Sequence, residues 1–295
     1  MTSAGDALVG LRRTLAAVSP SAALDAEIIV AQVLGCSRAA LAAWPQQELT
    51  RTQSENLEAV TQRRLAGEPI AYLTGRREFW SLDLEVTRDV LVPRPESELL
   101  VELTLLKLRN IEAPEVLDLG TGCGAIALAL ASERPDAQVT ATDLSGAALA
   151  VATGNAVRLG IDNVRFLRGS WFEPLAARRF HAIVSNPPYV ADDDPAIAAL
   201  LHEPRAALAA GPRGLDALAA ICAGAARHLR DRGALLVEHG ATQGPAVRTL
   251  LAGGGLSRVS THRDLAGHPR ATEGTLGEWA LELRLTQKDT LDDPI

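Results

Sequence analysis

The sequence has 295 residues, of which 47% are hydrophobic, 22% are charged and only 3% are aromatic, and its formal net charge is −7. This length predicts one large or two modest folded domains, and the composition excludes disorder as the main state. No apolar run approaches the roughly 18 residues that a membrane helix needs, so we expect a soluble, cytoplasmic protein. The acidic balance disfavours direct binding of duplex DNA.

The cysteines and histidines lack the spacing of a metal site. Cys36, Cys123 and Cys222 are far apart, unlike the paired cysteines of a zinc site or a redox disulfide, so we expect buried thiols. The six histidines include no H-E-x-x-H pattern. We therefore expect no metal.

The first 75 residues carry a helical pattern. Leucine, isoleucine and valine recur there at steps of three to five residues, which is typical of amphipathic helices. Thr50, with Gln53 three residues later, has the form of a capping box at the start of a helix, and Gly67 followed by Pro69 marks its end. The pattern predicts a small helical domain over 1–75.

The period changes to two after this region. Apolar and polar residues alternate over 80–86, as in a half-buried strand. We expect a hairpin linker over 76–95, with its turn near Arg88 and Asp89 and a returning strand over 90–92. A helix over 96–108 should follow it.

From residue 115 onward, short apolar runs alternate with helical stretches, which predicts an α/β domain over 96–286 followed by a polar tail over 287–295. The expected strands cover 116–119, 138–143, 163–167, 181–185, 234–238, 256–261 and 279–285. The expected helices cover 125–133, 145–159, 215–229 and 243–251.

A glycine-rich loop follows the first of these strands. Gly120, Gly122 and Gly124 let the backbone turn tightly and approach a ligand, and a helix begins directly after them at Ala125. The pattern also fits the dinucleotide-binding motif G-x-G-x-x-A, and a tight turn without any ligand explains it as well.

Two further signals follow the next two strands. Asp143 ends the second strand, where an acidic residue accepts hydrogen bonds from ribose hydroxyls in both dehydrogenases and methyltransferases; the alternative is a helix N-cap. Trp171 and Phe172 follow the third strand, where an aromatic ring can stack on adenine, although core packing is an equally good interpretation.

The most specific signal is the run Ser185-Asn186-Pro187-Pro188-Tyr189 after the fourth strand. Carboxyl ends of strands line the ligand crevice of open α/β sheets. Two prolines hold the backbone rigid and donate no N–H, so the run offers carbonyl acceptors, the Asn186 amide and the Tyr189 ring. Such a corner can bind an NH2 group through the Asn186 oxygen and the Pro187 carbonyl.

Taken together, these motifs resemble the class I methyltransferases that use S-adenosyl-L-methionine, and more closely the release factor glutamine methyltransferases. The resemblance covers about 60–285 and includes YLTGRREFW, LVPRPESELLVE, LDLGTGCGAIALALASERP, SNPPYV, LLVEHG and DLAGHPR. It implies a Rossmann-like fold with a mostly parallel seven-stranded sheet, and an all-α N-terminal domain joined to it by a β-hairpin. It also implies methylation of the side-chain amide nitrogen of glutamine in the Gly-Gly-Gln motif of class 1 release factors.

Residue by residue, the resemblance implies two sets of contacts. The cofactor would be bound by Gly120, Thr121, Gly122, Cys123, Gly124, Asp143, Trp171 and Asn186. The glutamine would be bound by Asn186, Pro187, Pro188 and Tyr189, with Asn186, Pro187 and Tyr189 as the catalytic group. Two residues depart from the family pattern: Cys123 stands where Ser or Thr is expected, and Ser170 where an acidic residue is common. The segment over 192–208 is also slightly shorter, although Glu203 and Pro204 are retained.

Other functions remain open on these residues. The same corner suits an exocyclic amine of adenine or guanine in DNA or RNA. A nicotinamide-dependent oxidoreductase would explain the glycine loop and Asp143 but not the Asn186 corner. Because an amide nitrogen is a weak nucleophile, we expect catalysis by positioning, with no general base. The N-terminal helices and the hairpin are expected to bind the release factor away from its glutamine.

Overall fold

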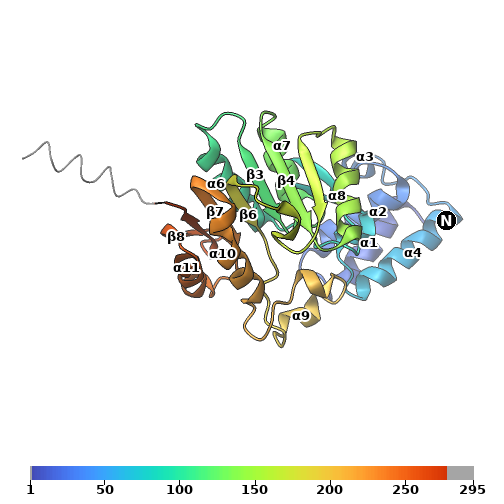
Figure 1. Ribbon diagram of the computed structural model, residues 1–295. Coiled ribbons are helices and arrows are strands. Elements are labelled where there is room, and N and C mark those ends of the chain that lie inside the picture. Colours follow the sequence, from blue (N-terminus) through green and yellow to red (C-terminus); the bar gives the residue numbers. More distant parts are fainter. Residues whose placement is uncertain (1, 278–295) are drawn as a thin grey trace, which may run out of the picture.

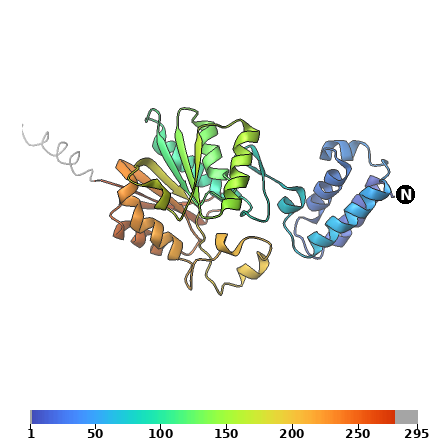
Figure 2. The ribbon, with the colours of Figure 1, turned by 45° about the vertical axis from the view of Figure 1, so that its right-hand side comes forward.

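The computed structural model describes residues 2–277, and it contains a lobe of N-terminal helices beside a larger lobe built on a sheet (Figures 1 and 2). The strand expected over 279–285 and the tail over 287–295 lie outside the described residues. Within 2–277, every helix is too short or too polar to cross a membrane.

The N-terminal lobe is helical, as the sequence predicts. Its elements are α1 (Ala4–Leu15), α2 (Ala22–Leu34), α3 (Arg38–Ala43), α4 (Arg51–Leu65) and α5 (Ile70–Thr74). They enclose a hydrophobic cluster that includes Leu15, Ile29 and Val30, which are fully buried. The capping box of Thr50 and Gln53 is confirmed at the start of α4.

A hairpin follows, but its turn is not where the sequence analysis placed it. The strands are β1 (Arg76–Phe79) and β2 (Leu82–Glu85), so the run over 80–86 is not one strand. The chain turns at Trp80 and Ser81, whose φ angles are +51° and +59°. The chain also turns at Arg88 and Asp89, where the Val90 amide donates to the Thr87 carbonyl at 3.2 Å, but this is not the hairpin turn, and the returning strand expected over 90–92 is wrong. The hairpin turn was missed because it uses no glycine and so gave no sequence signal.

The seven-stranded sheet is confirmed. Its strands are β3 (Glu115–Leu119), β4 (Gln138–Asp143), β5 (Val164–Arg168), β6 (Phe180–Ser185), β7 (Leu229–Glu238), β8 (Ser257–Arg263) and β9 (Pro269–Thr275), in the order β5-β4-β3-β6-β7-β9-β8. The pairs among β3 to β7 are parallel, and β9 is antiparallel to both β7 and β8. The strand β9 was not predicted, because its run PRATEGT has no apolar alternation.

Helices cover both faces of the sheet (Figure 1). On one face lie α6 (Glu98–Leu108), α7 (Ala125–Glu133) and α8 (Gly146–Leu159), and on the other lie α10 (Asp216–His228) and α11 (Gly244–Gly253). Along β3, Val116 belongs to the first core and Leu117 to the second, as the period of a strand requires. The short elements are η1 (Pro95–Ser97), η2 (Glu173–Leu175), α9 (Ala196–Ala199) and η3 (Arg205–Ala207).

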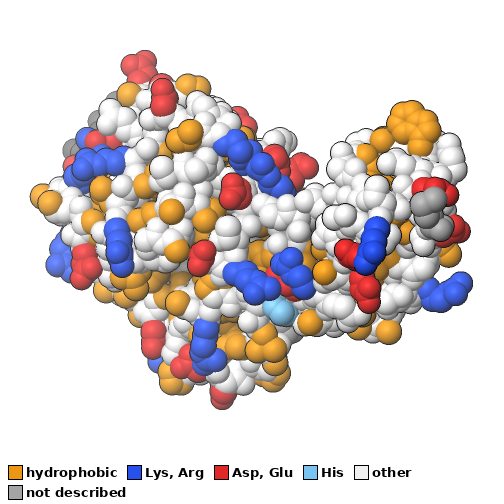
Figure 3. Space-filling model, turned by 90° about the vertical axis from the view of Figure 1, so that its right-hand side faces the viewer, with side chains coloured by type: hydrophobic (Ala, Val, Ile, Leu, Met, Phe, Trp, Pro, Cys, Tyr) orange, Lys and Arg blue, Asp and Glu red, His pale blue; other side chains and the backbone are white. Residues whose placement is uncertain are grey.

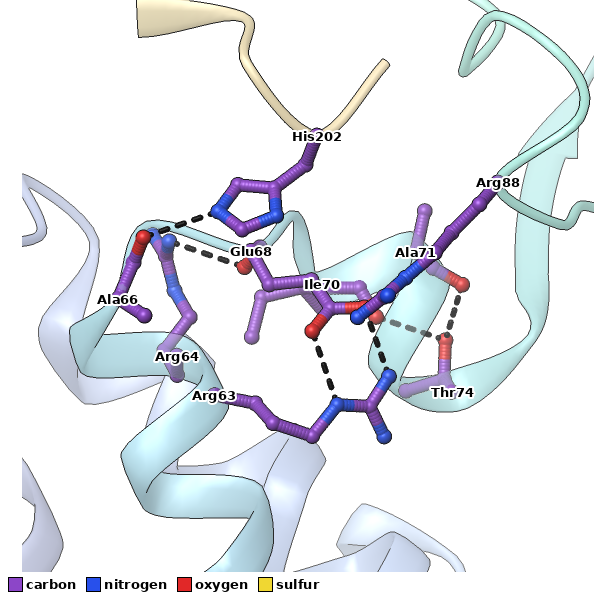
Figure 4. A network of polar contacts seen from close by, with 9 residues as sticks. All are labelled: Arg63, Arg64, Ala66, Glu68, Ile70, Ala71, Thr74, Arg88 and His202. Atoms are coloured by element: carbon purple, nitrogen blue, oxygen red, sulfur yellow. Dashed lines mark hydrogen bonds and ion pairs between the residues drawn. The ribbon is translucent and has the colours of Figure 1, made fainter. Parts of the chain in front are cut away.

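Arginine side chains and a histidine gather where the two lobes meet (Figure 3). Figure 4 shows Glu68 between two arginines: it accepts hydrogen bonds from Arg63 at 2.7 and 2.8 Å and from Arg88 at 2.8 and 3.0 Å. The Arg63 guanidinium above all holds the pKa of this carboxyl at about 2. The His202 ring contacts the Ala66 carbonyl at 2.9 Å. An ion pair therefore joins the helical lobe to the hairpin segment, and a hydrogen bond joins it to the loop after β6.

Candidate active site

The candidate site lies where the order of the strands reverses. The central strand β3 pairs with β4 on one side and with β6 on the other. The connection after β3 runs to β4 and the connection after β6 runs to β7, so the two connections leave in opposite directions across the sheet. Leu119, at the end of β3, is in register with Thr142 and with Ser185. The loops after these three strands therefore open at one edge of the sheet, where open α/β sheets bind their ligands.

The glycine loop after β3 needs its glycines. The φ angles of Gly120, Gly122 and Gly124 are +72°, +57° and +88°. A Cβ atom on Gly124 would lie 3.0 Å from Leu128 and 3.2 Å from Ala152, whereas one on Gly122 would meet nothing within 4 Å. The loop is thus closely packed behind Gly124 and open beside Gly122, which leaves room for a ligand against its backbone.

An acidic residue lies beneath this loop. Thr121 donates a hydrogen bond of 2.6 Å to Asp118 Oδ2, while the buried Asp118 Oδ1 has no hydrogen-bond partner among the described residues. Burial raises the pKa of Asp118 to about 7. When ionised, Asp118 places negative charge under the loop, which favours a cationic ligand. From the sequence, Asp118 was placed at the start of the glycine-loop motif but was given no role in the site; its acidity next to the glycines was the signal available.

Cys123 contributes to the loop through its backbone. Its side chain is buried, and burial raises the pKa of the thiol to about 12, so it stays protonated. The presence of cysteine in place of Ser or Thr therefore leaves the charge of the loop unchanged.

Asp143 ends β4 beside the glycine loop. Its Oδ2 accepts a hydrogen bond from the Gly122 amide at 2.9 Å, and its Oδ1 accepts one from the Ser145 amide at 2.8 Å. Ser145, and not Asp143, caps the N-terminus of α8. Each carboxylate oxygen keeps a further acceptor position, so Asp143 can still bind a hydroxyl.

The two aromatic residues after β5, Trp171 and Phe172, contact different parts of the protein. Trp171 lies against the glycine loop, since a Cβ atom on Gly120 would be 3.4 Å from its ring. Phe172 instead stacks on His228 of α10, with 4.8 Å between ring centroids. Of the two interpretations offered for Phe172, the structure supports core packing, because its ring packs beneath α10.

The diproline corner follows β6 at the same edge of the sheet. Ser185 donates a hydrogen bond of 2.7 Å to the Leu119 carbonyl, which ties the end of β6 to the end of β3. Within the corner, Pro187 is buried, whereas Asn186, Pro188 and Tyr189 are half-buried. The corner and the glycine loop thus lie on adjacent strands of one opening.

Two oxygen atoms of the corner have no partner among residues 2–277. The Asn186 Nδ2 group donates to Ser97 Oγ at 2.9 Å. No described residue donates to Asn186 Oδ1 or to the Pro187 carbonyl. These are the two acceptors that the sequence analysis assigned to an incoming NH2 group.

Tyr189 forms hydrogen bonds with Glu238 and Gln243 on the side of the corner that faces the protein interior. Its hydroxyl donates to Glu238 Oε1 at 3.1 Å, and its carbonyl accepts from Gln243 at 3.0 Å. Burial raises the pKa of the Tyr189 hydroxyl well above its usual range. The tyrosine therefore stays neutral and does not act as a base.

The loop after the corner is fastened to the segment before α6. The buried Glu203 accepts a hydrogen bond of 3.0 Å from the Val92 amide and pairs with Arg94. Arg94 thus connects the two walls of the opening. Among the described residues, no cluster of three or more His, Cys, Asp or Glu side chains has the arrangement of a metal site.

Comparison with known proteins agrees with this geometry. The family model "PrmC N-terminal domain" matches residues 6–75, and "Methyltransferase small domain" matches residues 96–246. The release factor glutamine methyltransferase of Coxiella burnetii is 47% identical over 270 residues, which cover 92% of this chain and 98% of that protein. The protein of the same name from Pseudomonas aeruginosa is 49% identical over 89% of this chain and 94% of its own length.

Among solved structures, the 16S rRNA N2 G1207 methyltransferase of T. thermophilus, in complex with AdoMet and guanosine, superposes with a TM-score of 0.53 at 21% identity, covering 68% of this chain and 50% of that one. A methyltransferase from Pyrococcus furiosus gives 0.51 at 18% identity, over 75% of this chain and all of that one. These likenesses show the class I methyltransferase fold. The sequence relatives and the family model establish that the chain belongs to the release factor glutamine methyltransferase family.

Proposed function

We propose that this protein transfers a methyl group from S-adenosyl-L-methionine to the side-chain amide nitrogen of glutamine in the Gly-Gly-Gln motif of class 1 release factors. The observation that carries the proposal is the pair of unpartnered acceptors, Asn186 Oδ1 and the Pro187 carbonyl, beside the glycine loop in a chain of this family. Two acceptors match the two N–H bonds of one carboxamide.

The residues around the glycine loop fit this cofactor. Asp143 has acceptor positions left for ribose hydroxyls, and the Trp171 ring forms a wall beside Gly120. The unpartnered oxygen of Asp118 favours the positive charge that the cofactor carries. When bound, the cofactor supplies a methyl group activated by its sulfonium.

The chain's own residues position the acceptor amide. Asn186 Oδ1 and the Pro187 carbonyl accept both N–H bonds, which stabilises the positive charge that develops on nitrogen and draws its lone pair out of conjugation. The methyl group would form a bond to nitrogen as its bond to the sulfonium sulfur breaks, and the amide proton that it replaces would pass to solvent water. Asp118 lies beneath the loop and Glu238 lies behind the corner, where two protein hydroxyls occupy it, so neither carboxyl faces the amide as a base. The main contribution of these residues to catalysis is to orient the amide nitrogen toward the methyl group.

The helical lobe serves, in this proposal, as the docking region for the release factor, with 1–75 as the recognition domain, 76–95 as the linker and 96–286 as the catalytic domain. A tripeptide offers too little surface for selective binding, since stable interfaces bury roughly 800 Å² on each partner. The ion pair of Glu68 with Arg88 joins this lobe to the hairpin segment, and the hydrogen bond between His202 and the Ala66 carbonyl joins it to the loop after the corner.

Mass spectrometry of a release factor incubated with the protein and cofactor tests the function. We expect one added methyl group on the glutamine of Gly-Gly-Gln, and none on a release factor in which that glutamine is replaced. Asn186→Ala should lower turnover by roughly 10² to 10³, with a smaller change in cofactor affinity. Turnover near that of the unchanged protein would refute the role of Asn186. Methyl label in nucleic acid, with none in release factor, would favour the amine-methylating alternative.

A further inference from the structure

A chain of hydrogen bonds runs behind the Asn186 corner. Asn186 Nδ2 donates to Ser97 Oγ at 2.9 Å, Ser97 Oγ donates to Glu238 Oε2 at 2.6 Å, and the Tyr189 hydroxyl donates to Glu238 Oε1 at 3.1 Å. Ser97 ends η1, Glu238 ends β7, and the other two residues belong to the loop after β6. Ser97 and Glu238 are 3% and 1% exposed, so water does not compete for these bonds.

The positions of the protons determine which group is donor and which is acceptor in each of these hydrogen bonds. A serine hydroxyl has one proton, and Ser97 gives it to the Glu238 carboxylate in a short, charge-assisted bond. Ser97 is then left as an acceptor only, so the Asn186 group that faces it must be the NH2. A flipped amide would bring Oδ1 against the lone pairs of Ser97, with no proton between two buried oxygens, which is unfavourable.

We propose that Glu238, acting through Ser97, sets the orientation of the Asn186 carboxamide, so that Oδ1 faces the incoming glutamine amide as an acceptor. This inference rests on the proposed function for its substrate. Ser97 and Glu238 are positioning residues, because they lie behind the corner and act through Asn186. Without them, Asn186 is free to turn its NH2 toward the substrate NH2, where two donors would oppose each other.

The charge on Glu238 gives the proposal a pH dependence. Ser97 faces this carboxyl from η1, Tyr189 from the corner, Arg270 from β9 and the acidic Glu96 from η1. Burial outweighs the hydrogen bonds and the Arg270 charge, and raises the pKa of Glu238 to about 7. A protonated Glu238 no longer requires a proton from Ser97. The Ser97 hydroxyl can then donate to Asn186, so the orientation of the Asn186 amide is no longer fixed. Turnover should therefore rise with pH, following the ionised fraction of Glu238.

A purely structural tie between β7 and η1 is the alternative, and turnover measurements separate the two. Ser97→Ala and Glu238→Gln should each lower kcat by about 10-fold or more, as expected for a hydrogen bond to a charged group, with affinity for S-adenosyl-L-methionine changed less than about threefold. Ser97→Thr, which keeps the hydroxyl, should restore most of kcat. Thr104→Val, which removes a buried hydroxyl from α6, is the matched control and should leave kcat unchanged.

Residues that act in series are not additive, so the double variant of Ser97→Ala and Glu238→Gln should be no slower than Ser97→Ala alone. The acid limb of the kcat profile, with an apparent pKa near 7, should be absent in Glu238→Gln. Additive losses, or an unchanged acid limb in Glu238→Gln, would overturn the proposal.

A measurement that needs no turnover keeps this inference separate from the proposed function. In protein labelled with ¹⁵N-asparagine, the side-chain NH2 signals of Asn186 should titrate with Glu238 and lose that titration in Glu238→Gln and in Ser97→Ala. NH2 signals that do not respond to either variant contradict the orientation proposal, even if glutamine is methylated. Responding signals without methylation of the release factor support the orientation proposal and contradict the function.

Discussion

Asn155 of α8 joins the hairpin to the glycine loop, and its removal should affect both stability and cofactor binding. Its side chain is fully buried. Oδ1 accepts from the Glu85 amide at 2.7 Å and from Arg158 at 2.9 Å, and Nδ2 donates to the carbonyls of Glu85 and Cys123, each at 3.0 Å. Asn155→Ala removes all four bonds.

The size of the effect follows from these four bonds. Water can replace the partners of Glu85, which is exposed, but the Cys123 carbonyl lies in the buried part of the loop. At a net contribution of about 1 kcal/mol for a hydrogen bond, and more for a buried carbonyl left unpaired, we expect a loss of about 3 kcal/mol. In a chain of this size that lowers Tm by about 5 °C. The loop bond alone, at about 1.4 kcal/mol, predicts a tenfold rise in the Kd for S-adenosyl-L-methionine.

Differential scanning fluorimetry and equilibrium cofactor binding measure these two quantities. Asn163→Ala is the matched control, because Asn163 Nδ2 lies 3.1 Å from each of the carbonyls of Ala131, Arg134 and Ala137 at the opposite edge of the sheet. It should lower Tm and leave the Kd unchanged. Equal effects of the two variants on Kd, or no effect of Asn155→Ala, would show that Asn155 does not hold the loop for its ligand.

Three further predictions concern the loop and the helical lobe. Burial raises the pKa of Asp118 from 3.8 to about 7, so the folded state binds this proton more tightly than the unfolded chain does. The free energy of unfolding therefore falls as pH rises from about 4 to about 7. Asp118→Asn should therefore stabilise the protein by roughly 1 to 3 kcal/mol at pH 8, with little effect at pH 4, and should weaken cofactor binding; denaturant titrations at both pH values check this. Gly124→Ala should cost about 1 to 3 kcal/mol, because its φ is positive and its surroundings are closed, whereas Gly122→Ala, in an open surrounding, should lose less stability and more cofactor affinity. Deletion of 1–70 should raise the Michaelis constant for the release factor much more than for a short glutamine peptide, and equal rises would refute the docking role.

Local patterns predicted much of the fold. The strand over 138–143 and the helix over 125–133 have the predicted bounds, because apolar periodicity and flanking turn residues agree there. The turn at Trp80 and Ser81 was not predictable from composition, since it takes positive φ angles without glycine or asparagine. The strand β9 was missed because it is defined by pairing with β7 and β8, and not by its own apolar residues.

The site was predicted where function lies in a continuous motif. The glycine loop and the corner over 185–189 are such motifs, and their backbone requirements can be read in order. Ser97 and Glu238 form their contacts across 141 residues of sequence, and no local spacing reveals such a pair. The same holds for Asn155, whose partner Glu85 is 70 residues away. Phe172 shows the reverse case, in which adjacency to Trp171 suggested a shared role that the packing against α10 does not support.

The most direct test of the central claim is the structure of a complex with S-adenosylhomocysteine and a release-factor peptide that contains Gly-Gly-Gln. We expect the glutamine NH2 to lie about 2.7 to 3.2 Å from both Asn186 Oδ1 and the Pro187 carbonyl, with its nitrogen directed toward the cofactor sulfur. A glutamine bound elsewhere, or a corner whose two acceptors are occupied by the protein's own donors, would contradict the account.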